Sequence, residues 1–148
     1  MANVYITALI ESLEKKRDVL KEICLKNAEQ YKLATKVPFP ESDFDKNSEE
    51  KGVLIYKLNK LDEGFELTYE KVREELGGSK EKYKSEILTM QQLIAEITDL
   101  STKIQADELR NKNALEKYFK GERSKLKGLR SQSRAARSYQ ETMSLMRK

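Results

Sequence analysis

The chain has 148 residues, of which 36% are charged and 38% hydrophobic, and its formal net charge is +4. This balance is too polar for a thick globular core, in which roughly a quarter of the residues are charged. It is also too apolar and too periodic for a disordered chain, and is typical of long amphipathic helices.

The first predicted helix runs from about residue 3 to residue 36. A seam of mostly apolar residues, spaced alternately by four and three, extends from Ile6 to Ala34, as in a coiled coil. Three more apolar residues widen this seam enough to meet two partner helices: Leu9, Val19 and Ile23. Pro38 and Pro40 then end the helix, because proline restricts the residue before it to extended geometry.

The second predicted helix runs from about residue 48 to residue 76. Ser48 is a suitable N-cap, and acidic residues follow it in the first turn, where they suit the helix dipole. The same spacing continues in Leu54, Leu58, Leu61, Phe65, Thr68, Val72 and Leu76. Gly64 costs up to about 1 kcal/mol relative to alanine, and is compatible with the close approach of a neighbouring helix. Gly77 and Gly78 predict a reversal of chain direction.

The third predicted helix runs from Ser79, a suitable N-cap, to about residue 120. Its seam keeps the spacing without a skip from Tyr83 to Tyr118. At 1.5 Å per residue this helix would span roughly 60 Å, against roughly 45–50 Å for the other two. We therefore predict an all-α fold, an antiparallel three-helix coiled-coil-like bundle over residues 1–120 with a long third helix, followed by a mobile tail over residues 121–148.

Two polar residues, Glu108 and Asn111, fall on the seam of the third helix. A polar residue at such a position can fix the register of the helices at some cost in stability. The alternative is that the helix has already left the bundle there, so that the seam need not be dry. We favour the second interpretation.

Charge is distributed unevenly along the chain. Residues 1–109 carry 17 basic and 22 acidic side chains, a net of −5, whereas residues 110–148 carry 12 basic and 3 acidic side chains, a net of +9. The basic end could follow nucleic-acid phosphates, but it offers few aromatic side chains for base stacking and no recognised nucleic-acid module. It could instead be a solvated, partly helical tail. A third interpretation is a segment that folds on a partner and is anchored by Leu126, Leu129, Tyr139, Met143 and Met146.

The residues that catalysis most often uses are missing. The chain has no histidine, which excludes a Ser-His-Asp triad, a Cys-His pair and a Glu-x-x-His metal site. It has no glycine-rich phosphate loop, and Cys24 lies on the seam of the first helix, where it acts as a small hydrophobic residue. We therefore predict a protein that is not an enzyme and takes no cofactor or metal.

The single cysteine and the hydropathy pattern bear on location. One cysteine cannot form an internal disulfide, which favours a reducing compartment. The chain has no apolar run of about 18 residues and no basic leader before its first apolar residues. We therefore predict a cytoplasmic protein that does not insert into membranes.

Three stretches carry a likeness to a known family. They are residues 11–23, residues 50–61, and Asn111-Lys-Asn-Ala-Leu115 followed by Leu126, Leu129 and finally Tyr139. On these residues the chain resembles the FlgN family of flagellar type III export chaperones. It departs from the family in the long proline-containing linker at residues 37–47 and in its strongly basic tail.

The resemblance implies a chaperone that holds flagellar hook–filament junction subunits in an unassembled, export-ready state. It also implies that Tyr139 docks the loaded chaperone on the export gate. The predicted partner-binding residues are Leu115, Tyr118, Leu126, Leu129, Tyr139, Met143 and Met146. Two other classes stay open: a generic coiled-coil scaffold or adaptor, and a nucleic-acid-binding helical protein, which the sequence disfavours.

Overall fold

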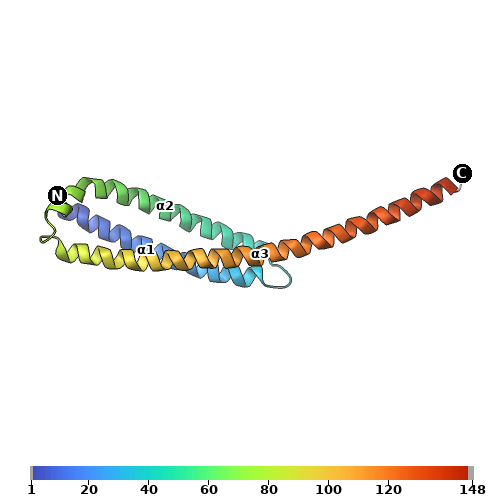
Figure 1. Ribbon diagram of the computed structural model, residues 1–148, viewed down its shortest axis with the longest axis horizontal. Coiled ribbons are helices and arrows are strands. Elements are labelled where there is room, and N and C mark those ends of the chain that lie inside the picture. Colours follow the sequence, from blue (N-terminus) through green and yellow to red (C-terminus); the bar gives the residue numbers. More distant parts are fainter. Residues whose placement is uncertain (1, 147–148) are drawn as a thin grey trace.

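The computed structural model of the chain is built from three helices (Figure 1). It describes the backbone of residues 2–146 and the side chains of residues 3–127. Helix α1 spans Ala2–Ala34, α2 spans Glu41–Gly78 and α3 spans Lys84–Met146, and residues 2–146 contain no strand. Successive helices run in opposite directions, so α1 and α3 are parallel. The predicted fold class, an antiparallel three-helix bundle with a long third helix, is confirmed.

Helix α1 is the central element of the bundle. Both α2 and α3 pack against it, whereas no Cα atom of α2 lies within 8 Å of a Cα atom of α3 in the described residues. This arrangement follows from the widened apolar seam of α1, which has Leu9 and Ile23 beside the main line of residues and so meets two neighbours. As a consequence, α2 and α3 are held apart along much of their length.

The hydrophobic core runs along both sides of α1. Its buried members, from all three helices and the turn between α2 and α3, are Ile6, Leu9, Leu13, Leu20, Ile23, Leu54, Val72, Leu76, Tyr83, Met90, Leu93 and Ile97. Burying one aliphatic side chain of this size contributes about 1.5–3 kcal/mol. The core is therefore a long, thin layer whose stability is spread along the bundle.

Helix α2 begins at Glu41, seven residues before the predicted start at Ser48. Pro40 precedes the first turn, where it removes no helical hydrogen bond, and Glu41 and Asp43 suit the positive end of the helix dipole. The added turns extend the seam from Leu54 towards the N-terminus through Lys51, Asn47 and Phe44. Of these three residues only Phe44 is apolar. The predicted linker over residues 37–47 is confirmed for residues 37–40, but residues 41–47 are helical, because the prediction relied on apolar periodicity.

Helix α3 begins at Lys84, five residues after the predicted start at Ser79. Ser79 instead ends α2, and its backbone N–H donates to the carbonyl oxygen of Glu75 at 2.9 Å. The hydroxyl of the buried Tyr83 donates to the Glu75 carboxylate at 2.8 Å, which raises the pKa of Tyr83. Tyr83 thereby ties the turn between α2 and α3 to the end of α2.

A buried polar layer occupies the part of the bundle where α3 carries Glu108 and Asn111. Asn111 is only 3% exposed, and its Nδ2 donates to the carbonyl oxygen of Asn27 in α1 at 2.9 Å. Lys51 of α2 is also buried and forms an ion pair with Glu108 at 2.5 Å. The favoured interpretation, that α3 has left the bundle here, was therefore wrong, because Asn111 is a core residue and Glu108 pairs with a buried lysine of α2.

The bundle ends in a set of stacked aromatic rings. Phe39, in the connection between α1 and α2, stacks on Tyr118 of α3 with the ring centroids 4.2 Å apart. Beyond this contact α3 continues alone, past the other two helices (Figure 1). We predicted that the helix ends near residue 120, but it runs to Met146. Residues 121–146 contain no proline and are rich in good helix formers, so the loss of apolar periodicity does not end the helix.

None of the described helices combines the length and the apolar character that a bilayer span requires.

Candidate partner-binding site

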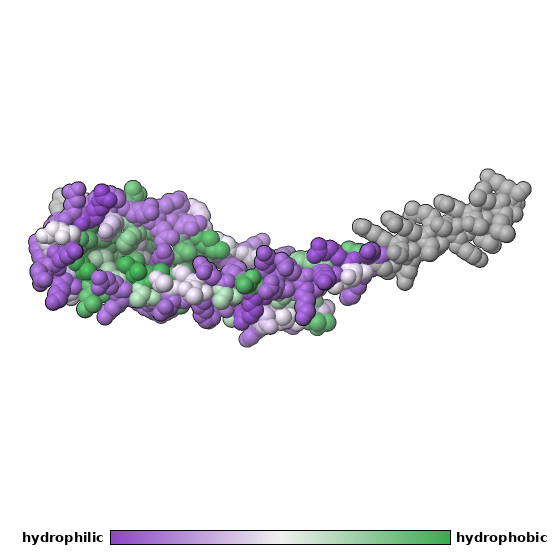
Figure 2. Space-filling model, in the orientation of Figure 1, coloured by the Kyte–Doolittle hydropathy of each residue, from purple (hydrophilic) through white to green (hydrophobic). Residues whose placement is uncertain are grey.

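An open groove lies between α2 and α3, and residues of α1 line one half of it. It consists of two hollows of about 490 and 570 Å³ that adjoin at Phe65 and Ile94, which line both. Figure 2 shows apolar side chains gathered on this face between α2 and α3, with hydrophilic side chains along both edges. The groove exists because α2 and α3 each pack against α1 and not against one another.

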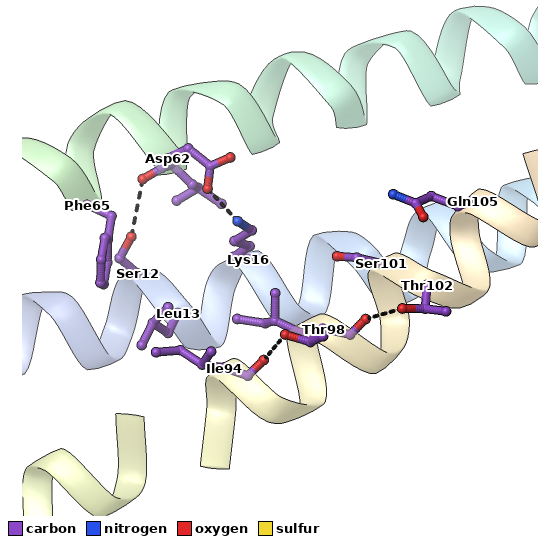
Figure 3. A pocket seen from close by; sticks show the side chains of 12 residues that line it. Ser12, Leu13, Lys16, Asp62, Phe65, Ile94, Thr98, Ser101, Thr102 and Gln105 are labelled. Carbon is purple, nitrogen blue, oxygen red and sulfur yellow. Dashed lines mark hydrogen bonds and ion pairs between the residues drawn. The ribbon is translucent and has the colours of Figure 1, made fainter. Parts of the chain in front are cut away.

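One half of the groove is apolar in its depth and lined with hydroxyl groups along α3. In Figure 3, Phe65 of α2, Leu13 of α1 and Ile94 of α3 surround the hollow. Thr98 and Thr102 continue the α3 wall, and each hydroxyl donates to the carbonyl oxygen four residues earlier. Because these hydroxyl groups have partners within their own helix, they add little polarity to the wall.

The charges in this half are neutralised. Lys16 of α1 and Asp62 of α2 form an ion pair at 2.7 Å (Figure 3), and both side chains are partly exposed. Ser12 donates a long hydrogen bond to the carbonyl oxygen of Leu61, at 3.5 Å. The wall on the α1–α2 side therefore presents no net charge to a molecule in the groove.

The other half of the groove, next to the turn between α2 and α3, is cationic. Lys80, Lys84 and Arg73 line it against a single acidic residue, Glu81. Arg73 pairs with Glu70 of its own helix at 3.4 Å, whereas Lys80 and Lys84 form no ion pair with any described residue. Apolar side chains here are half-exposed, among them Tyr69 and Leu88.

The residues that the sequence predicts for partner binding do not form one surface. Leu115 and Tyr118 are half-buried at the aromatic end of the bundle, where the Tyr118 ring is already covered by Phe39. Leu126 is 52% exposed on the part of α3 beyond the bundle. The side chains of the other four lie outside the described residues: Leu129, Tyr139, Met143 and Met146.

The part of α3 beyond the bundle, residues 119–146, is a second surface with partner-binding character. We call it the α3 extension. Its exposed apolar residues include Phe119 and Leu126, and the ion pair between Lys125 and Glu122, at 3.4 Å, lies within the helix itself. The extension carries seven basic and two acidic residues. It is therefore a cationic helix with exposed apolar side chains.

Protein-family models, curated proteins and solved structures contain no match to this chain.

The titratable groups include one cysteine, Cys24, which is partly buried. Burial raises the pKa of the Cys24 thiol above its usual 9.0, so little of the reactive thiolate forms near neutral pH. Within the described residues no group of three or more cysteine, aspartate or glutamate side chains is placed to hold a metal ion. What the two surfaces offer is apolar area and charge.

The sequence did not identify the groove, although several of its lining residues belong to predicted seams. Leu61, Phe65 and Ile94 lie on predicted seams, and the spacing assigns them to the core of the bundle. In the structure Leu61 and Phe65 are only half-buried and Ile94 is 48% exposed. Periodicity shows that a seam of apolar residues must be buried, but it does not show whether the residues that bury it belong to the same chain.

Proposed function

We propose that this protein binds other proteins through their amphipathic helices, in the cytoplasm and without catalysis. The observation that carries the proposal is the α3 extension, which leaves the bundle at the stacked pair Phe39–Tyr118 and has exposed apolar side chains. A helix of this kind gains stability when a partner helix covers its apolar side chains. Leu126 is the described residue best placed for that contact.

The finer proposal is an export chaperone for flagellar hook–filament junction subunits. It rests on the resemblance of residues 11–23, 50–61 and 111–115 to the FlgN family. In this proposal the α3 extension covers the terminal helices of the subunits, and Tyr139 contacts the export gate. The shape of the molecule supports the coarser part, because a rigid bundle carrying one free helix suits a protein that presents a binding segment.

A pull-down tests the proposal. Full-length protein and a variant with a stop codon after Lys120 serve as baits in lysate of the source organism, and bound proteins are identified by mass spectrometry. Recovery of flagellar junction subunits by the full-length protein alone supports the chaperone function. Recovery of nucleic-acid-associated proteins that dissociate with added salt, or of the bait alone as an oligomer, contradicts it and favours a nucleic-acid binder or a scaffold.

A point substitution localises the contact. Leu126→Glu should weaken subunit binding by about tenfold or more, because it places a charge in an apolar contact. The matched control is Leu67→Glu, since Leu67 is an exposed leucine of α2 outside the groove. Circular dichroism of both variants should match the unsubstituted protein. Equal binding by the two variants would contradict the role of Leu126.

A further inference from the structure

We infer that the groove between α2 and α3 is a docking site for one amphipathic helix of a partner protein, about 20 residues long, with acidic side chains at the end that lies over the α2–α3 turn. This site is separate from the α3 extension. The inference does not rest on the proposed function, because it concerns different residues and holds for any class of partner.

The burial along α2 shows that a neighbour is missing. Leu54, Val72 and Leu76, towards the two ends of the α2 seam, are buried. Leu61 and Phe65, between them, are only half-buried. On the facing helix, Ile94 is 48% exposed. The same apolar seam is therefore covered at its ends and open in its middle, where the two helices face each other across the groove (Figure 2).

The shape of the opening fits a helix. The groove lining on α3 extends from Lys84 to Gln105, which at 1.5 Å per residue corresponds to about 30 Å. Its walls are two helices that run antiparallel to each other, and α1 lines the half away from the α2–α3 turn. A helix laid along the groove would complete a four-helix bundle, the arrangement that buries such seams by knobs-into-holes packing.

The charges identify which helix fits. Lys80 and Lys84 line the turn end with the single acidic residue Glu81, whereas Arg73 is paired with Glu70, so this end carries an excess of positive charge. The opposite half holds the neutral pair Lys16–Asp62. A partner helix with carboxylates at one end and an otherwise uncharged inner face complements both halves, and charge complementarity of this kind sets orientation and specificity.

A second copy of the chain fits less well. The α3 extension of another molecule carries seven basic residues against two acidic ones, so at the turn end it would place positive charges next to Lys80 and Lys84. Pairing two grooves face to face would join two concave surfaces and leave the hollows unfilled. The occupant is therefore a different chain with an acidic end.

Three synthetic peptides of about 20 residues test the inference against the full-length protein. All have helix-forming backgrounds. The acid-end peptide has an apolar seam and glutamates at one end, the base-end peptide has lysines in their place, and the broken-seam peptide has serines in place of the seam leucines. Fluorescence anisotropy should show the acid-end peptide binding about tenfold or more tightly than either of the others.

Variants of the full-length protein place the peptide in the groove. Ile94→Glu should weaken binding of the acid-end peptide by about tenfold or more, and Tyr69→Glu repeats the test from α2 in case the first variant unfolds. Leu25→Glu is the control, because Leu25 is 71% exposed on α1 and does not line the groove. The double variant Lys80→Glu/Lys84→Glu should reverse the preference in favour of the base-end peptide.

Several results would overturn the inference. They are equal affinity for the acid-end and base-end peptides, no binding of the acid-end peptide, or full binding by Ile94→Glu and Tyr69→Glu. A dimer in sedimentation experiments that Ile94→Glu dissociates would show that a second copy is the occupant. Leu126→Glu should bind the acid-end peptide normally, so failure of the groove and failure of the α3 extension are distinguishable.

Discussion

Gln30 connects the three helices through one side-chain oxygen. Its Oε1 accepts hydrogen bonds from Nζ of Lys51 at 3.2 Å and from Nδ2 of Asn111 at 3.1 Å. The three residues belong to α1, α2 and α3 in turn. A shift of one helix by a single turn would break at least one of these bonds, so the polar layer fixes the register of the bundle.

The buried asparagines around Gln30 use only part of their hydrogen-bonding capacity. Asn27 is fully buried, and neither its Nδ2 nor its Oδ1 has a hydrogen-bond partner among the described residues. The Oδ1 atoms of Asn47 and Asn111 also have no hydrogen-bond partner there. Unpaired buried amide atoms reduce stability. The layer therefore favours a single register at a cost in stability, which an apolar seam would not incur.

Substitution of Asn111 tests the contribution of this layer. Asn111→Ala removes the bonds to Gln30 and to the carbonyl oxygen of Asn27, and we expect it to lower the free energy of unfolding by about 1–3 kcal/mol. Asn113→Ala is the control, because Asn113 is an exposed residue two positions further along the same helix, and should change stability by less than about 0.5 kcal/mol. Urea denaturation measures both. Similar losses for the two variants would contradict the role of the layer.

The ion pair between Lys26 and Glu50 makes stability depend on pH. The hydrogen bond between them lowers the pKa of Glu50 below 4.5 and raises that of Lys26 above 10.5. The pair therefore stabilises the fold fully between pH 4.5 and 10.5. Its contribution is lost as pH falls through the lowered pKa of Glu50, or rises through the raised pKa of Lys26.

The urea midpoint of the protein and of Glu50→Gln, measured across pH, tests this dependence. The difference between the two midpoints should be constant between pH 4.5 and 10.5 and should shrink at more acidic and more alkaline pH. Glu49→Gln serves as the control, since Glu49 is exposed and forms no ion pair with a described residue. A difference for Glu50→Gln that does not change with acidification would show that the pair does not stabilise the fold.

At the scale of the element, α2 contains a glycine that no neighbour requires. A Cβ atom added to Gly64 would meet no atom within 4 Å, so the glycine does not mark a close helix approach. Gly64→Ala should raise the free energy of unfolding by about 0.5–1 kcal/mol, because alanine is the better helix former. Thermal or urea unfolding measures the gain. The reverse control is Ala95→Gly, at an exposed position of α3, which should lower the free energy of unfolding by a similar amount. A lower free energy of unfolding for Gly64→Ala would show that a neighbour approaches this position.

Helix α3 illustrates how packing and propensity act on one element. From Lys84 to Tyr118 it is held by α1 and by the aromatic contact with Phe39. Beyond Tyr118 the chain has suitable helix formers but no second helix beside it in Figure 1. Isolated helices are marginal in water, so this part depends on local propensity until a partner covers it. The predicted mobility of the tail over residues 121–148 stays a prediction.

At the scale of the molecule, backbone amides should be best protected from hydrogen exchange where their helix packs against another helix of the bundle. We expect the amides of residues 119–127 to exchange with solvent about tenfold or more faster than those of residues 90–111, because local opening costs little free energy where a helix is not packed. Hydrogen exchange measured by mass spectrometry checks this. Residues 9–23 of α1 serve as the protected reference. Equal protection of residues 119–127 and 90–111 would show that another surface covers the α3 extension.

The sequence by itself determined the helices and their faces. Apolar residues spaced by four and three define a seam from Ile6 to Ala34 and another from Tyr83 to Tyr118, and these patterns suffice because helical geometry repeats every 3.6 residues. Pro38 and Pro40 predict the first connection, and the glycine pair at Gly77 and Gly78 predicts the second. The helix bounds were less certain, because polar core residues such as Asn47 do not register in an apolar pattern.

Only the tertiary structure decided what each seam faces. Asn111 is buried where its Nδ2 donates to the carbonyl oxygen of Asn27 and to Gln30 of α1, and no local pattern reveals such partners. Ile94 is exposed because α1 holds α2 and α3 apart, although its spacing is that of a core residue. Periodicity depends on residues near in sequence, whereas burial depends on residues far apart in sequence, and so the groove became visible only in the folded chain.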